Sequence, residues 1–341
     1  MPAILSRVPS ETLLEVLRAY LPYSLPLYRR LQSPQGNDHH VLATTLPNLK
    51  SEGLDSELCF AAAYVERTRI PKTDCWLFLS CESRVDPSQS ATKKALCATC
   101  TDCLLAIVQE LTSIPAPAVV DDPDTIKANA KFLTHKYDRN LILIGSLNTS
   151  VASLLQNRGW LSSVHPGLKV TYTKYIFARD SIPSTITDEL PEGLRWGKVR
   201  DKDMELVQTR TGIPRPASSL RKFPSVAIFA TDTASRGEQD GTPIAWSFIG
   251  VDGSLITLHV EEEYRGRGLA KKLAANLFRT ALPEAYDMTG EPEGGYAHAD
   301  VALTNAASKG VCLSLGAKNP NNWEVCWTRL DLDKVRMSFN E

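Results

Sequence analysis

The residues best suited to chemistry follow a short apolar run in the last third of the chain. Residues 255–260 predict a buried strand, and a helix is expected from Gly268 to about residue 281. Gly266 and Gly268 allow the turn between strand and helix to direct its N–H groups inward. The helix N-terminus adds unpaired N–H groups and a positive dipole end, so the sequence predicts an anion site suited to a pyrophosphate.

The spacing of this loop resembles a known signature. Arg265-x-x-Gly268-x-Ala270 is similar to the Gln/Arg-x-x-Gly-x-Gly/Ala motif of the GNAT acyltransferase superfamily. The whole chain resembles the glycine N-acyltransferase branch, and fungal proteins with a related C-terminal domain share its late motifs. The other segments that carry the likeness are LRAYLPYSLPLYRRL near the N-terminus, Pro243-Ile-Ala-Trp246, Glu263-Tyr264-Arg265, Asn305-x-x-Ser308 with Leu315-Gly316, and Asn322-Trp323.

The resemblance implies an acyl-CoA co-substrate and the residues that would hold it. The main chain of the loop would bind the pyrophosphate, the end of the preceding strand would pair with the thioester carbonyl and the pantetheine arm, and a later helix would contact the pantetheine or shape the thiol exit. In that order the residues are Arg265, Gly266, Arg267, Gly268, Leu269 and Ala270; Leu258 and Val260; and Asn305 and Ser308.

Direct acyl transfer also needs a base for the amine and an acid for the leaving thiolate. Where many GNAT enzymes have a Glu base this chain has Ser254, which could orient a water molecule. Where many have a Tyr acid it has Cys312, whose thiol could donate a proton or simply pack in the core. His259 titrates near neutrality and could face the substrate or pack in the sheet. The catalytic candidates are therefore His259, Cys312 and Ser254.

Two further sets of residues leave alternatives open. His298 and Asp300 should share one face of a strand, where they could relay a proton or form a structural polar pair. Arg215 and Arg221 lie in the segment that GNAT proteins often use as a lid over the acceptor. Either could bind an acceptor carboxylate, or the segment could be a plain surface loop.

The chain has eight cysteines and no secretory signal is evident, so we expect reduced, buried thiols in a cytoplasmic protein. Cys97-x-x-Cys100-x-x-Cys103 resembles a metal or iron–sulfur run. It lacks an evident partner cysteine, and the three residues should share one face of a helix over residues 93–111. We therefore expect a buried helix face here and no metal.

Bulk properties limit the classes of partner. The 341 residues are 43% hydrophobic and 23% charged, which is ordinary for a globular protein, and the formal net charge is −1. A nucleic-acid partner is not expected without a basic excess, and no apolar run is long enough for a membrane span. The oligomeric state is left open.

The order of predicted elements indicates two α/β domains with mixed sheets. Residues 180–193 hold two prolines and four acids without periodicity, so we place the boundary there. Residues 1–182 are expected to form a degenerate GNAT-like domain without the loop motif, and residues 190–341 a GNAT N-acyltransferase domain.

The expected function is transfer of an acyl group, acetyl by default, to the amine of a small molecule such as an amino acid. A protein N-acetyltransferase is one alternative. The other is a non-catalytic CoA-binding protein, because the usual Glu and Tyr are missing.

Overall fold

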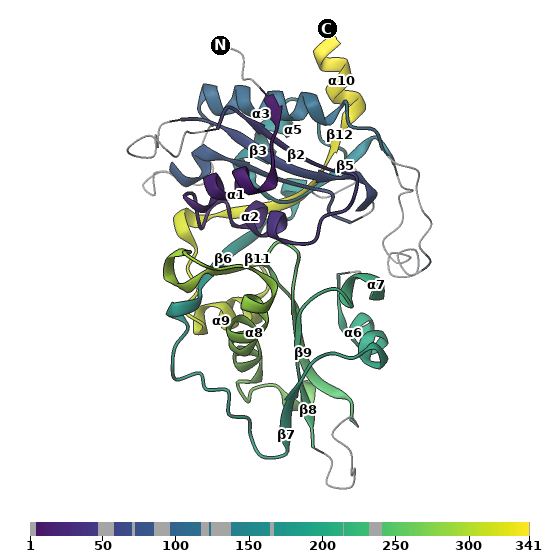
Figure 1. Cartoon of the computed structure of the whole chain (residues 1–341). Helices are drawn as coiled ribbons and strands as arrows, with labels where there is room; N and C mark the ends of the chain where they lie inside the picture. Colours follow the sequence, from purple (N-terminus) through teal and green to yellow (C-terminus); the bar gives the residue numbers. More distant parts are fainter. Residues whose placement is uncertain are drawn as a thin grey trace.

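The computed structural model describes residues 5–46, 58–69, 72–84, 96–116, 123, 138–163, 167–213, 215–231 and 241–340. Two halves stack end to end, and both termini lie at the N-terminal half (Figure 1). The surface loop expected at residues 83–93 and the hairpin turn expected at 237–243 lie largely outside the described residues.

The N-terminal half is built from short strands and helices. They are β1 (Leu5–Arg7), α1 (Ser10–Arg18), α2 (Leu25–Gln32), β2 (His39–Thr44), β3 (Ala61–Glu66), β4 (Cys75–Leu79), α3 (Ala98–Leu111), β5 (Leu141–Asn148), α5 (Thr149–Asn157) and β6 (Tyr172–Ala178).

The C-terminal half follows the order that the sequence predicts, with one added helix. Its elements are β7 (Leu194–Gly197), α6 (Met204–Arg210), α7 (Ala217–Leu220), β8 (Ser225–Ala230), β9 (Pro243–Ile249), β10 (Leu255–Val260), α8 (Leu269–Ala285), β11 (Tyr296–Ala302), α9 (Ala306–Ser314), β12 (Glu324–Asp331) and α10 (Leu332–Asn340). The predicted α/β class with mixed sheets is confirmed.

The two halves exchange strands. One sheet has the order β1-β2-β3-β4-β5-β12-β6-β11, and the other has the order β10-β9-β8-β7. The last strand of the chain, β12, therefore pairs with β5 of the N-terminal half, while β6, which precedes the expected boundary, pairs with β11. The domain boundary at residues 180–193 stays a prediction. Strands from both sides of this boundary lie in one eight-stranded sheet.

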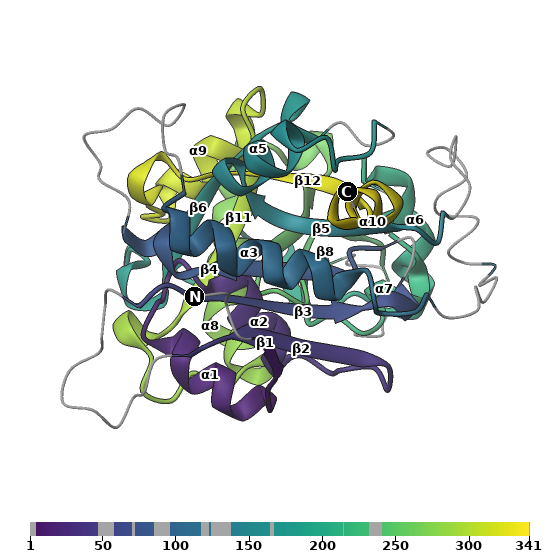
Figure 2. The same cartoon turned by 90° about the horizontal axis from the view of Figure 1, so that it is seen from above.

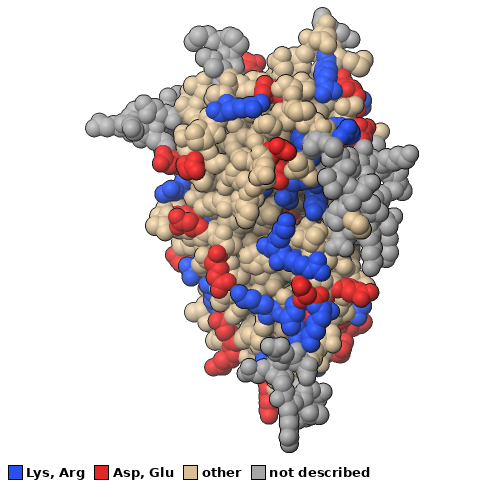
Figure 3. Space-filling view, turned by 45° about the vertical axis from the view of Figure 1, so that its right-hand side comes forward, with Lys and Arg blue, Asp and Glu red and all other residues tan. Residues whose placement is uncertain are grey.

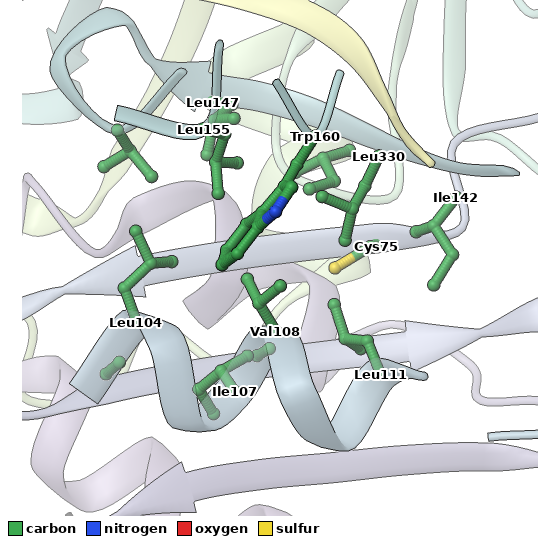
Figure 4. Packing of buried hydrophobic residues seen from close by; sticks show 14 of the residues in the cluster. Cys75, Leu104, Ile107, Val108, Leu111, Ile142, Leu147, Leu155, Trp160 and Leu330 are labelled. Atoms are coloured by element: carbon green, nitrogen blue, oxygen red, sulfur yellow. The ribbon is translucent and has the colours of Figure 1, made fainter. Parts of the chain in front are cut away.

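Helices cover both faces of the N-terminal strands. On one face α3, α5 and α10 enclose a core with the indole of Trp160 at its centre (Figures 2 and 4). Leu104, Ile107, Val108 and Leu111 of α3 point into this core. On the other face α1 and α2 pack against β2, β3 and β4, so that α2 lies between the two halves (Figure 1).

The four-stranded sheet is also covered on two faces. Val226, Ile228 and Ala245 face α8, whereas Phe229 and Trp246 belong to the cluster beneath α6 and α7. This alternation follows from the period of two along each strand. The end of β10 therefore lies between a helix that begins at the glycine loop and a helical segment on the opposite face.

Candidate functional site

The loop after β10 has the backbone that its glycines predict. Gly266 has φ 76° and Gly268 has φ 75°, in the left-handed region that other L-residues seldom adopt. Gly268 is the residue immediately before α8, and a Cβ placed on Gly266 would meet no atom within 4 Å. The glycines thus allow a tight turn whose outer surface is open.

The amides of this loop are free to bind a ligand. Among the described residues, no group accepts a hydrogen bond from the N–H of Arg267, Gly268, Leu269 or Ala270. The Arg265 Nε donates to the Val260 carbonyl at 3.0 Å, and the Arg267 guanidinium donates to the Glu263 carbonyl at 3.1 Å. The amides at the start of α8 are unpaired because the first turn of a helix has no preceding intrahelical carbonyl to accept from them.

Strands β10 and β11 separate next to this loop. Within the described chain they meet in one bridge, Ser254 to His298, where the His298 N–H donates to the Gly253 carbonyl at 3.2 Å. Beyond it β10 follows β9, with a register shift between Ile256 and His259. The two strands therefore belong to different sheets.

Within the residues that the structure describes, the end of β10 has unpaired N–H groups on its outer edge. The Glu261 N–H donates to the Ile244 carbonyl of β9 at 2.8 Å. Alternate residues of a strand direct their main-chain groups to opposite sides. The N–H groups of Leu258 and Val260 consequently point away from β9, toward the side where β11 diverges. An extended ligand chain can add to this edge as a strand would.

His259 lies on the face of the sheet that α6 and α7 cover. Its ring stacks on Trp246 with centroids 4.7 Å apart, and its Nε2 is 3.5 Å from a carboxylate oxygen of Glu261. Burial lowers the pKa of His259, and although Glu261 opposes this the net pKa stays below the ordinary value. A neutral imidazole, which can accept a proton, is thus favoured near neutral pH.

Ser254 belongs to a polar group at the start of β10. Its hydroxyl donates to the Asp252 carboxylate at 2.5 Å, and the Trp76 indole donates to the other carboxylate oxygen at 3.2 Å. Burial raises the pKa of Asp252, but His298, Ser254 and Trp76 outweigh it and leave the pKa below the usual range. Asp252 is therefore an anion held at the junction of the halves.

His298 and Asp300 share a face, as the sequence predicts, and Lys174 of β6 lies between them. The Lys174 ammonium donates to Asp300 at 2.6 Å and contacts His298 Nδ1 at 3.1 Å. Burial raises the pKa of Asp300, but Lys174 and His298 together hold it well below the usual range. Lys174 and His298 are fully buried, which favours the structural alternative over a proton relay.

Cys312, Asn305 and Ser308 come from α9 or its cap. The Cys312 thiol is packed in the apolar core with Leu315, and burial raises its pKa to about 12. The Asn305 side chain accepts a hydrogen bond from the Ser308 N–H at 3.0 Å, so these two residues cap the helix. Cys312 lies in the cluster that α8 covers, whereas His259 stacks on Trp246, which belongs to the cluster under α6 and α7.

The two arginines of the lid segment differ in their surroundings. Arg221 pairs with Asp201 at 3.2 Å on the surface. The Nε of Arg215 is buried without a hydrogen-bond partner in the described chain. Burial lowers the pKa of Arg215, and the nearby Asp252 carboxylate opposes that effect. Figure 3 shows Lys and Arg side chains gathered across the middle of one face of the molecule.

The structure thus brings the loop amides, the edge of β10 and His259 to one end of β10, and places Ser254 at its other end. Sequence reasoning missed Asp252 and Lys174. Asp252 lies in a polar turn. Lys174 lies in an otherwise apolar strand, and a lysine in such a strand indicates that it has a buried partner.

This fold and this loop define an acyltransferase of the GNAT superfamily, as the sequence signature indicates. A family model described as the acyl-CoA N-acyltransferase verG N-terminal domain matches residues 2–175. Because the match spans just over half of the chain, the protein belongs to that family. Such enzymes use an acyl-CoA co-substrate and an amine acceptor. The closer resemblance to the glycine N-acyltransferase branch stays a prediction.

Three solved structures illustrate what the fold of this chain is similar to. A Drosophila protein has a TM-score of 0.57 at 14% identity, over 96% of this chain and 98% of its own. A GCN5-related N-acetyltransferase from Sphaerobacter thermophilus has a TM-score of 0.46 at 13% identity, over 96% and 95% of the two chains. A glucosamine N-acetyltransferase region of a fungal multi-domain glucosaminidase has a TM-score of 0.44 at 13% identity, over 97% and 38%.

At these identities the likeness to the Drosophila protein concerns the fold alone, and the other two scores support no further argument. No curated protein matches the chain. Within the described ranges, a helix able to span a lipid bilayer is absent.

Proposed function

We propose that the chain transfers an acyl group, acetyl by default, from acyl-CoA to the amine of a small molecule that also carries a carboxylate, such as an amino acid. We propose a carboxylate on the acceptor because the buried Nε of Arg215 has no hydrogen-bond partner in the described chain. A buried N–H of a guanidinium without an acceptor is costly, and a substrate carboxylate would supply one. Arg221 is the weaker candidate because Asp201 already pairs with it.

The co-substrate is proposed to lie along β10 and the loop. The free amides from Arg267 to Ala270 would bind the pyrophosphate at the positive end of α8. The outer N–H groups of Leu258 and Val260 would pair with the pantetheine arm and polarise the thioester carbonyl. The Val260 carbonyl already accepts from Arg265, so only its N–H is available. Asn305 and Ser308 would lie near the thiol exit.

The proposed reaction needs no covalent enzyme intermediate. His259 takes a proton from the acceptor amine, whose nitrogen attacks the thioester carbon. A C–N bond forms, the C–S bond breaks, and the CoA thiolate takes up a proton. The pKa of about 12 makes the Cys312 thiol a weak proton donor, so the acid role of Cys312 has less support than the base role of His259. Ser254, held by Asp252, would orient a water molecule.

Thiol release from acetyl-CoA tests the proposal with matched acceptors, for example glycine and glycinamide, which differ in the carboxylate. We expect Arg215→Met to raise KM for glycine about 10- to 100-fold, because a hydrogen bond to a charged group contributes roughly 1.5–3 kcal/mol. Arg221→Met is the control and should change KM little.

Three outcomes would contradict this proposal in different ways. Isothermal titration without binding of acetyl-CoA would reject the co-substrate site. Binding without thiol release over a panel of amines and acyl-CoAs would favour the non-catalytic alternative. Faster reaction with peptides than with free amino acids would favour a protein N-acetyltransferase.

A further inference from the structure

Four cysteine side chains come together at the N-terminus of α3. Cys59 precedes β3, Cys81 lies in the short helical turn after β4, and Cys97 and Cys100 begin α3. The sulfur atoms of Cys59, Cys97 and Cys100 all lie within 4.8 Å of one another, and Cys59 and Cys97 are 3.5 Å apart. The Cys81 thiol lies near that of Cys100 and interacts with it electrostatically. The fold therefore supplies the partner cysteines that the sequence spacing did not reveal.

The spacing of the Cys59, Cys97 and Cys100 sulfur atoms suits three corners of a tetrahedral thiolate site. Zinc binds cysteine sulfur at about 2.3 Å, which places the sulfur atoms of a tetrahedron about 3.8 Å apart. Cys97 is not within the helix but immediately before it, and its sulfur accepts the Cys100 N–H at 3.4 Å. This hydrogen bond holds the Cys97 sulfur at the N-terminus of α3, close to the sulfur atoms of Cys59 and Cys100. The Arg84 guanidinium, 3.5 Å from the Cys59 sulfur, offsets part of the negative charge.

One further cysteine lies close to this cluster but is not part of it. Cys103, one turn further along α3, differs, because its thiol donates to the Cys59 carbonyl at 3.6 Å. Cys103 is therefore outside the ligand set.

We propose that Cys59, Cys97 and Cys100, whose sulfur atoms lie within 4.8 Å of one another, bind one Zn²⁺ ion and that the nearby Cys81 supplies the fourth ligand. Four sulfur ligands suit zinc, and a closed set of four leaves no open position for catalysis. Binding releases the thiol protons to solvent. The ion joins the start of α3 to β3 and to the turn after β4, and so fixes the helix that covers the core of Figure 4. This site is independent of the acyl-CoA loop.

The test uses the full chain, purified after expression with added zinc. Elemental analysis should give about one zinc per chain, and the Cys97→Ser/Cys100→Ser double variant should lose most of it. Cys103→Ser is the matched control on the same helix and should retain the zinc. Since the double variant could fail to fold, titration of the folded wild-type protein with a mercurial provides a second measurement. It should release zinc in step with thiol modification, and a chelator should lower the thermal midpoint.

Several results would overturn the proposal. One is a zinc-free chain whose unfolding midpoint is unchanged by a chelator. Another is a Cys59–Cys97 disulfide in freshly purified protein, found by mass spectrometry. Iron with acid-labile sulfide in the purified protein would show that the cysteines hold an iron–sulfur cluster instead of zinc. If Cys103→Ser lost as much zinc as the double variant, the proposed set of ligands would be wrong.

Discussion

His259 is the residue whose surroundings most directly set a measurable property of the proposed reaction. Its imidazole stacks on Trp246, and Glu261, Arg210 and Arg265 are the charged groups that act on it. Burial and the two arginines lower its pKa, whereas the Glu261 carboxylate raises it. A base must be neutral, so its activity is lost as pH falls through this pKa. The fall of kcat/KM at low pH, called the acid limb here, is therefore expected below about pH 6.5, the ordinary pKa of histidine.

The Glu261→Gln variant tests this assignment. Without the carboxylate, the protonated imidazole loses a favourable partner, and Arg210, now 3.0 Å from an amide instead of an anion, opposes protonation further. We expect the acid limb of kcat/KM to move to lower pH. Glu262→Gln, an exposed change in the same turn, should leave the limb unmoved.

His259→Gln should reduce kcat by about 10²- to 10⁴-fold, the usual contribution of a general base. If Glu261→Gln left the limb in place, or His259→Gln retained full kcat, the base would have to be sought elsewhere. A water molecule held by Ser254 would then be the next candidate.

The glycine immediately before α8 gives a prediction for both stability and the proposed binding of acyl-CoA. We expect Gly268→Ala to lower the free energy of unfolding by about 1–2 kcal/mol, because its φ of 75° disfavours a Cβ. It should also weaken acyl-CoA binding, since the loop amides would shift to relieve the strain. Chemical denaturation and isothermal titration measure the two effects.

Gly310→Ala is the matched control for this prediction. Gly310 lies exposed within α9, where a Cβ would meet no atom within 4 Å. The substitution should stabilise the helix by about 0.5–1 kcal/mol and leave affinity unchanged. Unaltered acyl-CoA affinity in Gly268→Ala would show that the loop amides do not bind the co-substrate.

At the scale of elements, sequence patterns predicted local structure well and long-range partners poorly. The strand–loop–helix at 255–285 was predictable because glycine, strand and helix signals all agree within a few residues. Strand β3, with the sequence AAAYVE, was not assigned because it is buried on both faces and shows no alternation. Helix α10 follows the last predicted strand without an intervening turn signal, and was missed as well.

The candidate site shows the same limit. The loop proposed to bind acyl-CoA lies in one continuous segment, so its residue spacing could be recognised in the sequence. Lys174 comes from a strand on the other side of the expected boundary and reaches His298 because β6 pairs with β11. Asp252 comes from a turn and meets His298 where β10 and β11 form their bridge. The cysteine cluster likewise joins segments that are far apart in the sequence.

The whole molecule is held together by shared strands and by buried ion pairs between its halves. Arg29 of α2 forms two hydrogen bonds of 2.6 Å to the Glu291 carboxylate, and both side chains are fully buried. The same guanidinium donates to the Tyr296 carbonyl at the start of β11 at 2.9 Å. Arg29 and Arg30 end the N-terminal segment that resembles the glycine N-acyltransferase branch. Through Arg29, this segment contributes a contact between the halves.

Because β11 and β12 lie in the same eight-stranded sheet as the strands of the N-terminal half, we expect the chain to unfold in one cooperative step. Glu291→Gln should lower the free energy of unfolding by about 3–5 kcal/mol, since it leaves the Arg29 charge buried and unpaired. Glu284→Gln is the control, because its pair with Lys198 at 3.3 Å is largely exposed and contributes at most about 1 kcal/mol. Urea unfolding followed by circular dichroism and by tryptophan fluorescence should give coincident curves for all three proteins. Two separated transitions, or a loss in Glu291→Gln confined to one probe, would show that the halves are independent domains despite their shared strands.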